Sequence, residues 1–325
     1  MEENLFQEHS DITELNTALG NIRQEISKVI VGQHQMVDLL LIGLLCDGHI
    51  LIEGVPGVAK TLAAKLVAKI IDVKFSRLQF TPDMMPSDVI GTAIFNPKEA
   101  AFTFKPGPVF SNIVLIDEIN RAPAKTQAAL FEVMEERQVT VDGYTHFMEH
   151  PFIVLATQNP VEQEGTYRLP EAQLDRFLFK IQVNYPTLQE EISILRNQQS
   201  RSQNELLQEV SKVLSPQAIG RFRNIVREVR IEPRLVEYIA MIINETRNNP
   251  SLFLGASTRA SLSLLKASKA FAAINGRDFV IPEDVISMAP HVLRHRIMLT
   301  PEKEMEGSSP DELIESIMKT VEVPR

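Results

Sequence analysis

The chain has 325 residues, a length that predicts two domains, or one large domain with an appendage, and excludes a single small module. Hydrophobic residues make up 44% and charged residues 23% of the chain, so it can form a sizeable core, and global disorder is excluded. The 33 lysines and arginines against 42 aspartates and glutamates give a net charge of −9, which argues against a surface that binds nucleic acid everywhere but leaves room for a local basic groove.

The cysteine content and the first residues indicate the compartment. Cys46 is the one cysteine, so no intrachain disulfide can form, which fits a reducing environment, and we expect this residue to belong to the core. The first ten residues, MEENLFQEHS, lack the positive and apolar regions of a secretory signal, and the longest apolar run, 39–46, is too short to cross a membrane. We therefore expect a cytoplasmic protein without a membrane span.

Residues 1–30 are predicted to form an amphipathic helical segment. Its apolar residues recur at helical spacing within a charged stretch: Leu15, Leu19, Ile22, Ile26, Val29 and Ile30. A second helix is predicted over 36–48, and its far more apolar composition indicates that it is buried.

The next part of the chain, 31–184, is predicted to be an α/β domain. Short apolar runs alternate there with helical segments, which is typical of a parallel sheet covered by helices on both faces. The predicted strands are 49–54, 75–80, 112–118, 151–157 and 177–183. Two further stretches, 93–107 and 139–149, alternate around turn signals, and each predicts a hairpin inserted beside the sheet.

Residues 185–325 are predicted to form an all-helical second domain. After Tyr185-Pro186 no strand-like run of the same quality recurs, and the apolar residues follow helical spacing. Because no long linker separates the two parts, we expect them to pack against each other.

A glycine-rich loop follows the first predicted strand and precedes a helix. The loop and the start of the helix comprise Gly54, Val55, Pro56, Gly57, Val58, Ala59, Lys60, Thr61 and Leu62. Backbone amides at a helix N-terminus bind phosphate oxygens, Lys60 adds a positive charge, and Thr61 offers a hydroxyl to Mg²⁺. Ala59 stands where the pattern expects glycine, so this residue should not adopt a positive φ freely and the loop should be slightly stiffer.

Two carboxylates end the predicted strand 112–118. Ligands bind at the carboxyl ends of parallel strands, so Asp117 is suited to holding Mg²⁺ and Glu118 to polarising the water that attacks a γ-phosphate. Asn159 follows the strand 151–157 and could position that water or the phosphate, although an Asn-Pro pair alone is also a common turn.

The combination of these motifs resembles the AAA+ ATPases. Within that superfamily, the residues in and around the motifs are most similar to the MoxR family. Four segments carry the resemblance: EGVPGVAKT, QFTPDMMPSDVIG, LIDEINRAPAKTQAALFEVMEERQVTVDG and ATQNPVEQEGTYRLPEAQLDRF. The match is dense over 31–184 and extends more loosely to GASTRA in the helical part.

The resemblance implies an AAA+ core followed by a helical lid, with ATP and Mg²⁺ as cofactors and a homo-oligomeric, hexameric ring as the working form. Val31 and Gly32, with Gln33, match the segment that flanks the adenine. Arg176 matches the arginine finger, which acts on the neighbouring subunit's nucleotide; a surface arginine paired with Asp175 or Glu171 is the alternative without the family match.

The family match also covers the start of a lid helix. Arg259 matches the second sensor, which contacts the γ-phosphate in its own or the adjacent subunit, and Thr258 stands where the family usually has proline. The hairpins 93–107 and 139–149 match insertions that project from the ring, where Phe102 and Phe104 either hold a client chain or pack against the sheet.

Some polar residues have more ordinary explanations. His291 and His295 lie four residues apart, but no third ligand is evident, so we expect solvation at a helix end and assign no metal besides Mg²⁺. Arg121 and Lys125 suit either a ring interface or a solvated first helical turn.

The resemblance implies an ATP-hydrolysing ring that remodels, matures or activates protein partners, and proteins with a von Willebrand factor A domain are the expected partners. A nucleic-acid-directed motor is an alternative that the acidic charge and the absence of a DNA-binding motif disfavour. A magnesium-chelatase-type subunit is a second alternative.

Overall fold

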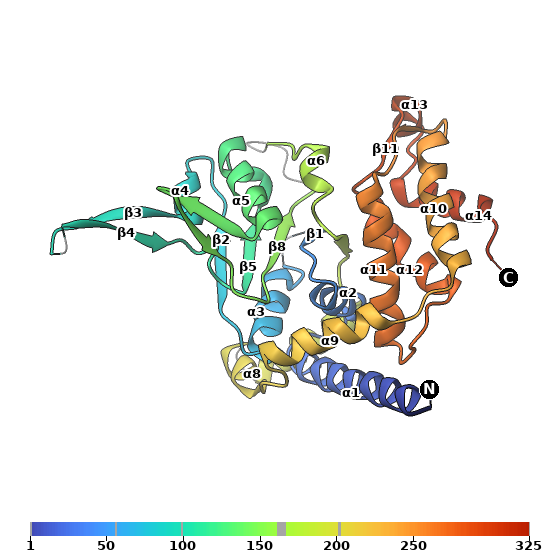
Figure 1. The fold of residues 1–325 in the computed structure, drawn as a ribbon, viewed down its shortest axis with the longest axis horizontal. Helices are drawn as coiled ribbons and strands as arrows, with labels where there is room; N and C mark the ends of the chain where they lie inside the picture. Colours follow the sequence, from blue (N-terminus) through green and yellow to red (C-terminus); the bar gives the residue numbers. More distant parts are fainter. Residues whose placement is uncertain (1, 56, 99, 161–166, 201–202, 325) are drawn as a thin grey trace.

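A parallel sheet of five strands organises the first half of the chain (Figure 1). The computed structural model describes residues 2–55, 57–98, 100–160, 167–200 and 203–324. The strands are β1 (Ile50–Gly54), β2 (Phe75–Gln79), β5 (Ile113–Asp117), β8 (Ile153–Gln158) and β9 (Phe179–Val183). They pair in the order β2-β5-β8-β1-β9, all parallel, which confirms the predicted α/β fold.

Helices cover both faces of the sheet, and the alternation along β5 shows how the sequence achieves this. Ile113 and Leu115 join one hydrophobic core with α2 (His34–Leu45) and α3 (Lys60–Ile70). Val114 and Ile116 point the other way, into a second core with α5 (Ala124–Glu136). The continuous apolar run of β5, residues 113–116, is therefore buried on both faces.

The first helix, α1 (Glu2–Ser27), packs against α3 and the helical part of the chain. Leu15, Leu19, Ile22 and Ile26 are buried along one face, as the helical spacing predicts, while Val29 is half-buried.

Two hairpins project beside the sheet. After the short helix α4 (Pro86–Ile90), β3 (Gly91–Asn96) and β4 (Ala101–Pro106) form a ribbon that extends far from the rest of the molecule (Figure 1). The second hairpin joins β6 (Gln138–Val141) to β7 (Tyr144–Phe147).

An aromatic contact joins the two hairpins. The Phe104 ring stacks on His146 with centroids 4.2 Å apart, whereas Phe102 is 71% exposed beside Phe95. The two phenylalanines therefore differ in their surroundings. Phe104 packs between the two hairpins, whereas Phe102 faces solvent.

The remainder of the chain is mainly helical. It comprises α7 (Leu188–Ser200), α8 (Gln203–Glu209), α9 (Pro216–Glu228), α10 (Pro233–Asn248), α11 (Thr258–Ile274), α12 (Pro282–Leu293), α13 (Pro301–Met305) and α14 (Pro310–Thr320). Five of these helices begin with proline, which suits the first turn because its missing N–H needs no partner there.

The expectation of an all-helical second part is wrong at one place. A small antiparallel ribbon joins β10 (Leu252–Leu254) to β11 (Met298–Leu299). Strands of two or three residues are too short to produce a recognisable alternation in the sequence. Within the described part of the chain, no helix combines the length and the apolar character that crossing a membrane requires.

Candidate functional site

The glycine-rich loop connects β1 to α3, as the sequence predicts. Gly54 ends the strand, and a Cβ there would lie 2.8 Å from Val183 O, so the close approach of β9 requires glycine. The Lys60 ammonium donates to Gly54 O and lies over the loop. Pro56 lies outside the described residues. The amides at the start of α3 and the lysine are thus placed together, as a phosphate site requires.

Ala59 departs from our expectation. It adopts φ 60° and ψ 18° as the N-cap of α3, although it has a Cβ. The turn from the strand into the helix requires the left-handed conformation here, and the loop accepts a strain of about 1 kcal/mol at this residue.

A small cavity of about 170 Å³ lies beside the loop, and both the loop and the segment expected to flank the adenine, through Val31 and Gln33, line it. Val31, Gly57, Val58, Ala59 and Leu62 line it. Gly32 does not line it and lies against the Glu190 side chain of α7.

The same cavity has lining residues that the sequence analysis missed. Ile194 from α7 and Leu206 from α8 complete its apolar wall, together with Pro186. Apolar residues on helices resemble ordinary core residues, so no sequence signal distinguishes them. The cavity therefore joins the loop to the first two helices after the sheet.

The carboxylate of Asp117 is fixed from two sides. Its Oδ2 accepts from Arg77 Nε at 2.6 Å, and its Oδ1 accepts from Thr157 Oγ1 at 3.1 Å. Asp117 is only 7% exposed, while the side chain of Arg77 is about half exposed. Arg77 can therefore move away without disrupting the core.

Glu118 follows directly and is held by different partners. Its Oε2 accepts from Gln79 Nε2 at 2.8 Å and lies 2.9 Å from Arg121 Nε. The backbone N–H of Glu118 donates to Thr157 Oγ1 at 3.1 Å. Arg77 and Gln79 were not expected at this site, because isolated polar residues near strand ends resemble ordinary surface positions.

Asn159 is buried and follows β8, the strand that lies between β1 and β5. It therefore occupies the position between the glycine-rich loop and the two carboxylates that its expected role requires. Lys125, the second cation after the carboxylates, is exposed on α5.

The oxygen donors at this edge fit a magnesium ion. The Thr61 hydroxyl comes from the first turn of α3 and the Asp117 carboxylate from the end of β5. Such hard oxygen ligands are the ones Mg²⁺ prefers, and Arg77, the partner of Asp117, is half exposed, so a cation can replace it at the carboxylate.

The two arginines that the family match singled out contact one carboxylate. Arg259 Nη2 lies 2.7 Å from Glu135 Oε1, and Arg176 Nη1 lies 3.8 Å from Glu135 Oε2. Neither of the alternative partners expected for Arg176, Asp175 and Glu171, forms an ion pair with it among the described residues; the pairing with Glu135 replaces that expectation.

Asp175 instead supports the start of α11. It accepts from Ser257 Oγ at 2.9 Å and lies 2.7 Å from Arg296 Nε and 3.9 Å from Arg259 Nη1. Ser257 caps the helix by accepting from Arg259 N, and Thr258 occupies its first helical position without disturbing it.

These arginines lie at the opposite edge of the sheet from the glycine-rich loop. Glu135 is near the end of α5, where the preceding residue, Met134, contacts His49 through its carbonyl. His49 precedes β1, whereas the loop follows that strand. Five residues of strand separate the two edges by roughly 15 Å. One subunit therefore does not bring its own loop and these arginines together.

The paired histidines are buried, so the expectation of solvation at a helix end is wrong. His291 Nε2 lies 3.3 Å from Gln35 Nε2, and His295 Nε2 lies 3.0 Å from Phe177 O. Cys46 is half-buried and packs against the core, and burial raises the pKa of its thiol to about 12, which disfavours the reactive thiolate.

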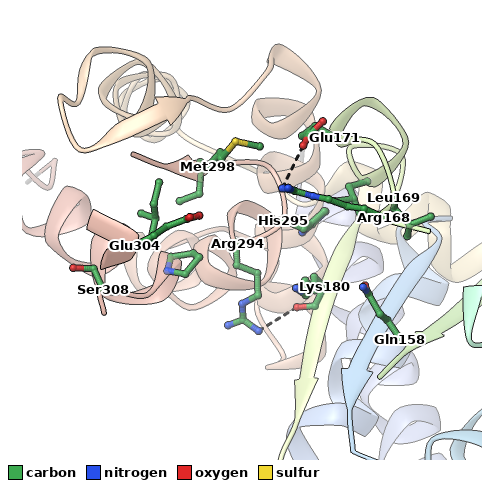
Figure 2. Close-up of a pocket in the computed structure, with 14 residues that line it drawn as sticks. Gln158, Arg168, Leu169, Glu171, Lys180, Arg294, His295, Met298, Glu304 and Ser308 are labelled. Atoms are coloured by element: carbon green, nitrogen blue, oxygen red, sulfur yellow. Dashed lines mark hydrogen bonds and ion pairs between the residues drawn. The ribbon is translucent and has the colours of Figure 1, made fainter. Parts of the chain in front are cut away.

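A larger cavity of about 480 Å³ lies between the sheet and the helical part (Figure 2). Its cations are paired. Arg168 lies 3.5 Å from Glu171, and Arg294 Nε lies 3.0 Å from Asp311 while its Nη1 donates to Lys180 O. These pairs join neighbouring elements and leave little uncompensated charge.

Comparison with known proteins agrees with this geometry. A model of the AAA family, "ATPase family associated with various cellular activities", matches residues 49–179, and a model of the AAA lid domain matches residues 244–317. The strands β1, β2, β5 and β8 and the glycine-rich loop lie within the first match, which ends at the first residue of β9, and Arg259 lies within the second.

Relatives match almost the whole chain. The uncharacterized protein YeaC of Bacillus subtilis is 47% identical over 96% of both chains, and Chaperone MoxR1 of Mycobacterium tuberculosis is 45% identical over 93% of this chain and 81% of its own. The crystal structure of a candidate ATPase from Cytophaga hutchinsonii superposes with a TM-score of 0.91 at 43% identity, covering 99% of each chain. The chain therefore belongs to the MoxR family of AAA+ ATPases.

Proposed function

We propose that this protein is a magnesium-dependent ATP hydrolase that works as a hexameric ring of identical subunits and that remodels, matures or activates protein partners. The observation that carries the proposal is the position of the glycine-rich loop and the paired arginines at opposite edges of one sheet. A catalytic unit that needs both must combine two subunits.

ATP binding is the first step that the residues support. The apolar cavity beside Val31 and Leu62 suits a purine ring, and the loop amides with Lys60 suit the phosphates. Thr61 and Asp117 would hold Mg²⁺, which neutralises phosphate charge when bound.

Hydrolysis requires an oriented water molecule. Glu118 is the proposed base, held by Gln79 and Arg121, and Asn159 is the proposed positioning group. Glu118 accepts the proton as the water oxygen attacks the γ-phosphorus, and the bond to the β–γ bridging oxygen breaks.

The arginines complete the site of the next subunit. Arg176 and Arg259 would stabilise the negative charge that develops on the transferred phosphoryl group. Because Arg259 lies beside Arg176 and not beside its own loop, the geometry favours action on the neighbour's nucleotide.

The helical part can respond to the nucleotide. Ile194 and Leu206 share the adenine cavity with Val58 and Leu62, so a bound base contacts both parts of the chain. Binding would close this contact and hydrolysis would relax it, which is how ATP would drive a change of shape.

Protein clients are the substrates we propose, with a von Willebrand factor A domain protein as partner and the cytoplasm as compartment. The exposed Phe102 on the long hairpin offers an apolar contact. The net charge of −9 disfavours a nucleic-acid track, and the naming of Chaperone MoxR1 supports a chaperone-like role over a chelatase subunit.

Replacing the proposed base tests the chemistry. Glu118→Gln should bind ATP and assemble while steady-state hydrolysis falls by about 100-fold or more, as expected when a general base is lost. Hydrolysis at the wild-type rate in this variant would overturn the assignment of Glu118.

A further inference from the structure

A separate cavity of about 300 Å³ lies where α2, α9 and α11 pack against one another near the end of α5. Five basic side chains line it: Arg137, Arg223, Arg227, Lys266 and Lys269. Asp47 is the one carboxylate among the described residues that line it. In a chain of net charge −9, this is a local excess of positive charge.

Arg223 is the buried centre of this cavity. It is nine-tenths buried, its Nε donates to Leu44 O at 2.9 Å, and its Nη1 lies 2.7 Å from Asp47 Oδ1. Its Nη2 has no hydrogen-bond partner among the described residues. A buried guanidinium with an unused donor is costly unless an acceptor occupies the cavity.

The single carboxylate is already shared. Asp47 Oδ2 lies 2.8 Å from Arg137 Nη1, so one negative charge serves two arginines. Lys269 donates to Arg227 O, a neutral carbonyl. The exposed side chains of Arg227 and Lys266 form no ion pair with a described residue.

The cations also disfavour one another. Burial lowers the pKa of the Arg223 guanidinium; Asp47 opposes the shift, whereas Arg137 and Arg227 add to it. Burial likewise lowers the pKa of Lys269. An anion in the cavity would attract each of these cations and so offset the repulsion between them.

The larger cavity in Figure 2 provides a contrast. There Arg168 is paired with Glu171 and Arg294 with Asp311, so each cation has its own carboxylate. The cavity around Arg223 has the same kind of basic residues without the matching acids.

We propose that the cavity around Arg223 binds a compound that carries a multiply charged phosphate group. Guanidinium groups bind phosphate oxygens with paired N–H donors, and lysines add point charges, so the residue types suit this chemistry. The volume of about 300 Å³ fits a pyrophosphate group with room for a small substituent. The site joins the end of α5 to α9 and α11, so its ligand would strengthen the contact between the two parts of the chain.

Titration calorimetry with inorganic pyrophosphate tests the proposal on the full-length protein. The Lys60→Ala background removes binding at the glycine-rich loop, so the remaining heat reports the second site. Arg227→Gln combined with Lys266→Gln should then weaken pyrophosphate binding about tenfold or more, because two charge-assisted contacts are lost. Both residues are exposed, so the fold should survive these changes.

Arg221→Gln is the matched control, because it removes one positive charge from the same helix at a residue that pairs with Glu14. It should leave the affinity within about twofold. Pyrophosphate binding that Lys60→Ala alone abolishes, or that the double variant leaves unchanged, would overturn the proposal. So would a double variant that changes only the state of assembly, since the cavity would then accept carboxylates of a neighbouring chain. Inorganic phosphate and ADP, titrated in parallel, distinguish a free anion from a nucleotide as the source of the phosphate.

Discussion

Arg259 lies 2.7 Å from the carboxylate of Glu135, and the same carboxylate lies 3.8 Å from Arg176. Both arginines therefore share one carboxylate of their own subunit, at the sheet edge that faces away from their own glycine-rich loop. If these arginines act on a neighbour's phosphates, the phosphates must compete with Glu135 for them. Glu135 would then set how readily neighbouring subunits complete the active site.

Removing this competition should favour the assembled state. Glu135→Gln keeps the size of the side chain and removes its charge, and partly exposed ion pairs of this kind are worth about 0–1 kcal/mol. The protein concentration for half-maximal ATP hydrolysis should therefore fall by up to about fivefold. Hydrolysis measured against protein concentration checks this. A rate as low as that of Arg259→Ala would show instead that Glu135 is needed to place the arginines.

Gln79 should matter for the rate of hydrolysis and not for nucleotide affinity. Its amide donates to Glu118 at 2.8 Å and so orients the proposed base, while it does not line the cavity beside the glycine-rich loop. Gln79→Ala should lower kcat by about tenfold and leave the Kd for ATP nearly unchanged. Ser76→Ala on the same strand is the control, since Ser76 donates to Pro108 O. Equal losses in both variants would argue for a general effect on β2.

Ala59→Gly should stabilise the loop. Glycine adopts the observed φ of 60° without strain, which gains about 1 kcal/mol, while the greater freedom of the unfolded chain offsets part of that gain. The free energy of unfolding in urea should therefore stay level or rise by up to about 1 kcal/mol. Ala63→Gly in the interior of α3 should destabilise instead. A clear loss of stability in Ala59→Gly would contradict the strain at this position.

Mild acid should weaken the fold through buried histidines. Burial lowers the pKa of His49 and of His291 to about 4, below the usual value of 6.5 that applies in the unfolded chain. Between pH 4 and pH 6.5 the unfolded chain binds more protons than the folded protein. The contribution of these neutral histidines to the free energy of unfolding is therefore fully present above pH 6.5 and is lost as the pH falls toward 4.

The loss at pH 5 should be about 2 kcal/mol for each of these histidines. His49 shows the cause directly, because its Nδ1 accepts from Val154 N and its Nε2 lies 3.0 Å from Met134 O, an arrangement that needs the neutral ring. Urea unfolding at pH 7 and pH 5 measures the loss, and His291→Gln should reduce it by about 2 kcal/mol. An unchanged loss in that variant would exclude His291 as a contributor.

The sequence predicted the fold where the pattern was continuous. The short apolar run that ends at Asp117 predicted a strand buried on both faces, and the place of the two carboxylates at its end followed from the expected parallel sheet. The ribbon β10–β11 was missed because its strands are too short to alternate.

The site was predictable only where local motifs define it. Arg77 and Gln79 were missed because their partners come from another strand, about 40 residues away along the chain. The contact between Arg259 and Glu135 joins residues 124 positions apart, and no local pattern encodes it. The buried state of His291 was also missed, because a helical position near other charged residues resembles a solvated one.

Mixing two inactive variants tests most directly whether two subunits share one active site. Lys60→Ala removes the loop lysine and Arg176→Ala removes the proposed trans-acting arginine, so each protein alone should hydrolyse ATP poorly. In an equal mixture, about one interface in four combines an intact loop with an intact arginine, so the rate should recover to about a quarter of wild type. A mixture of Lys60→Ala with Glu118→Gln should not recover, because both changes lie in the same half of the site. Recovery in the first mixture alone is the predicted result, and a first mixture as inactive as its components would contradict the shared site.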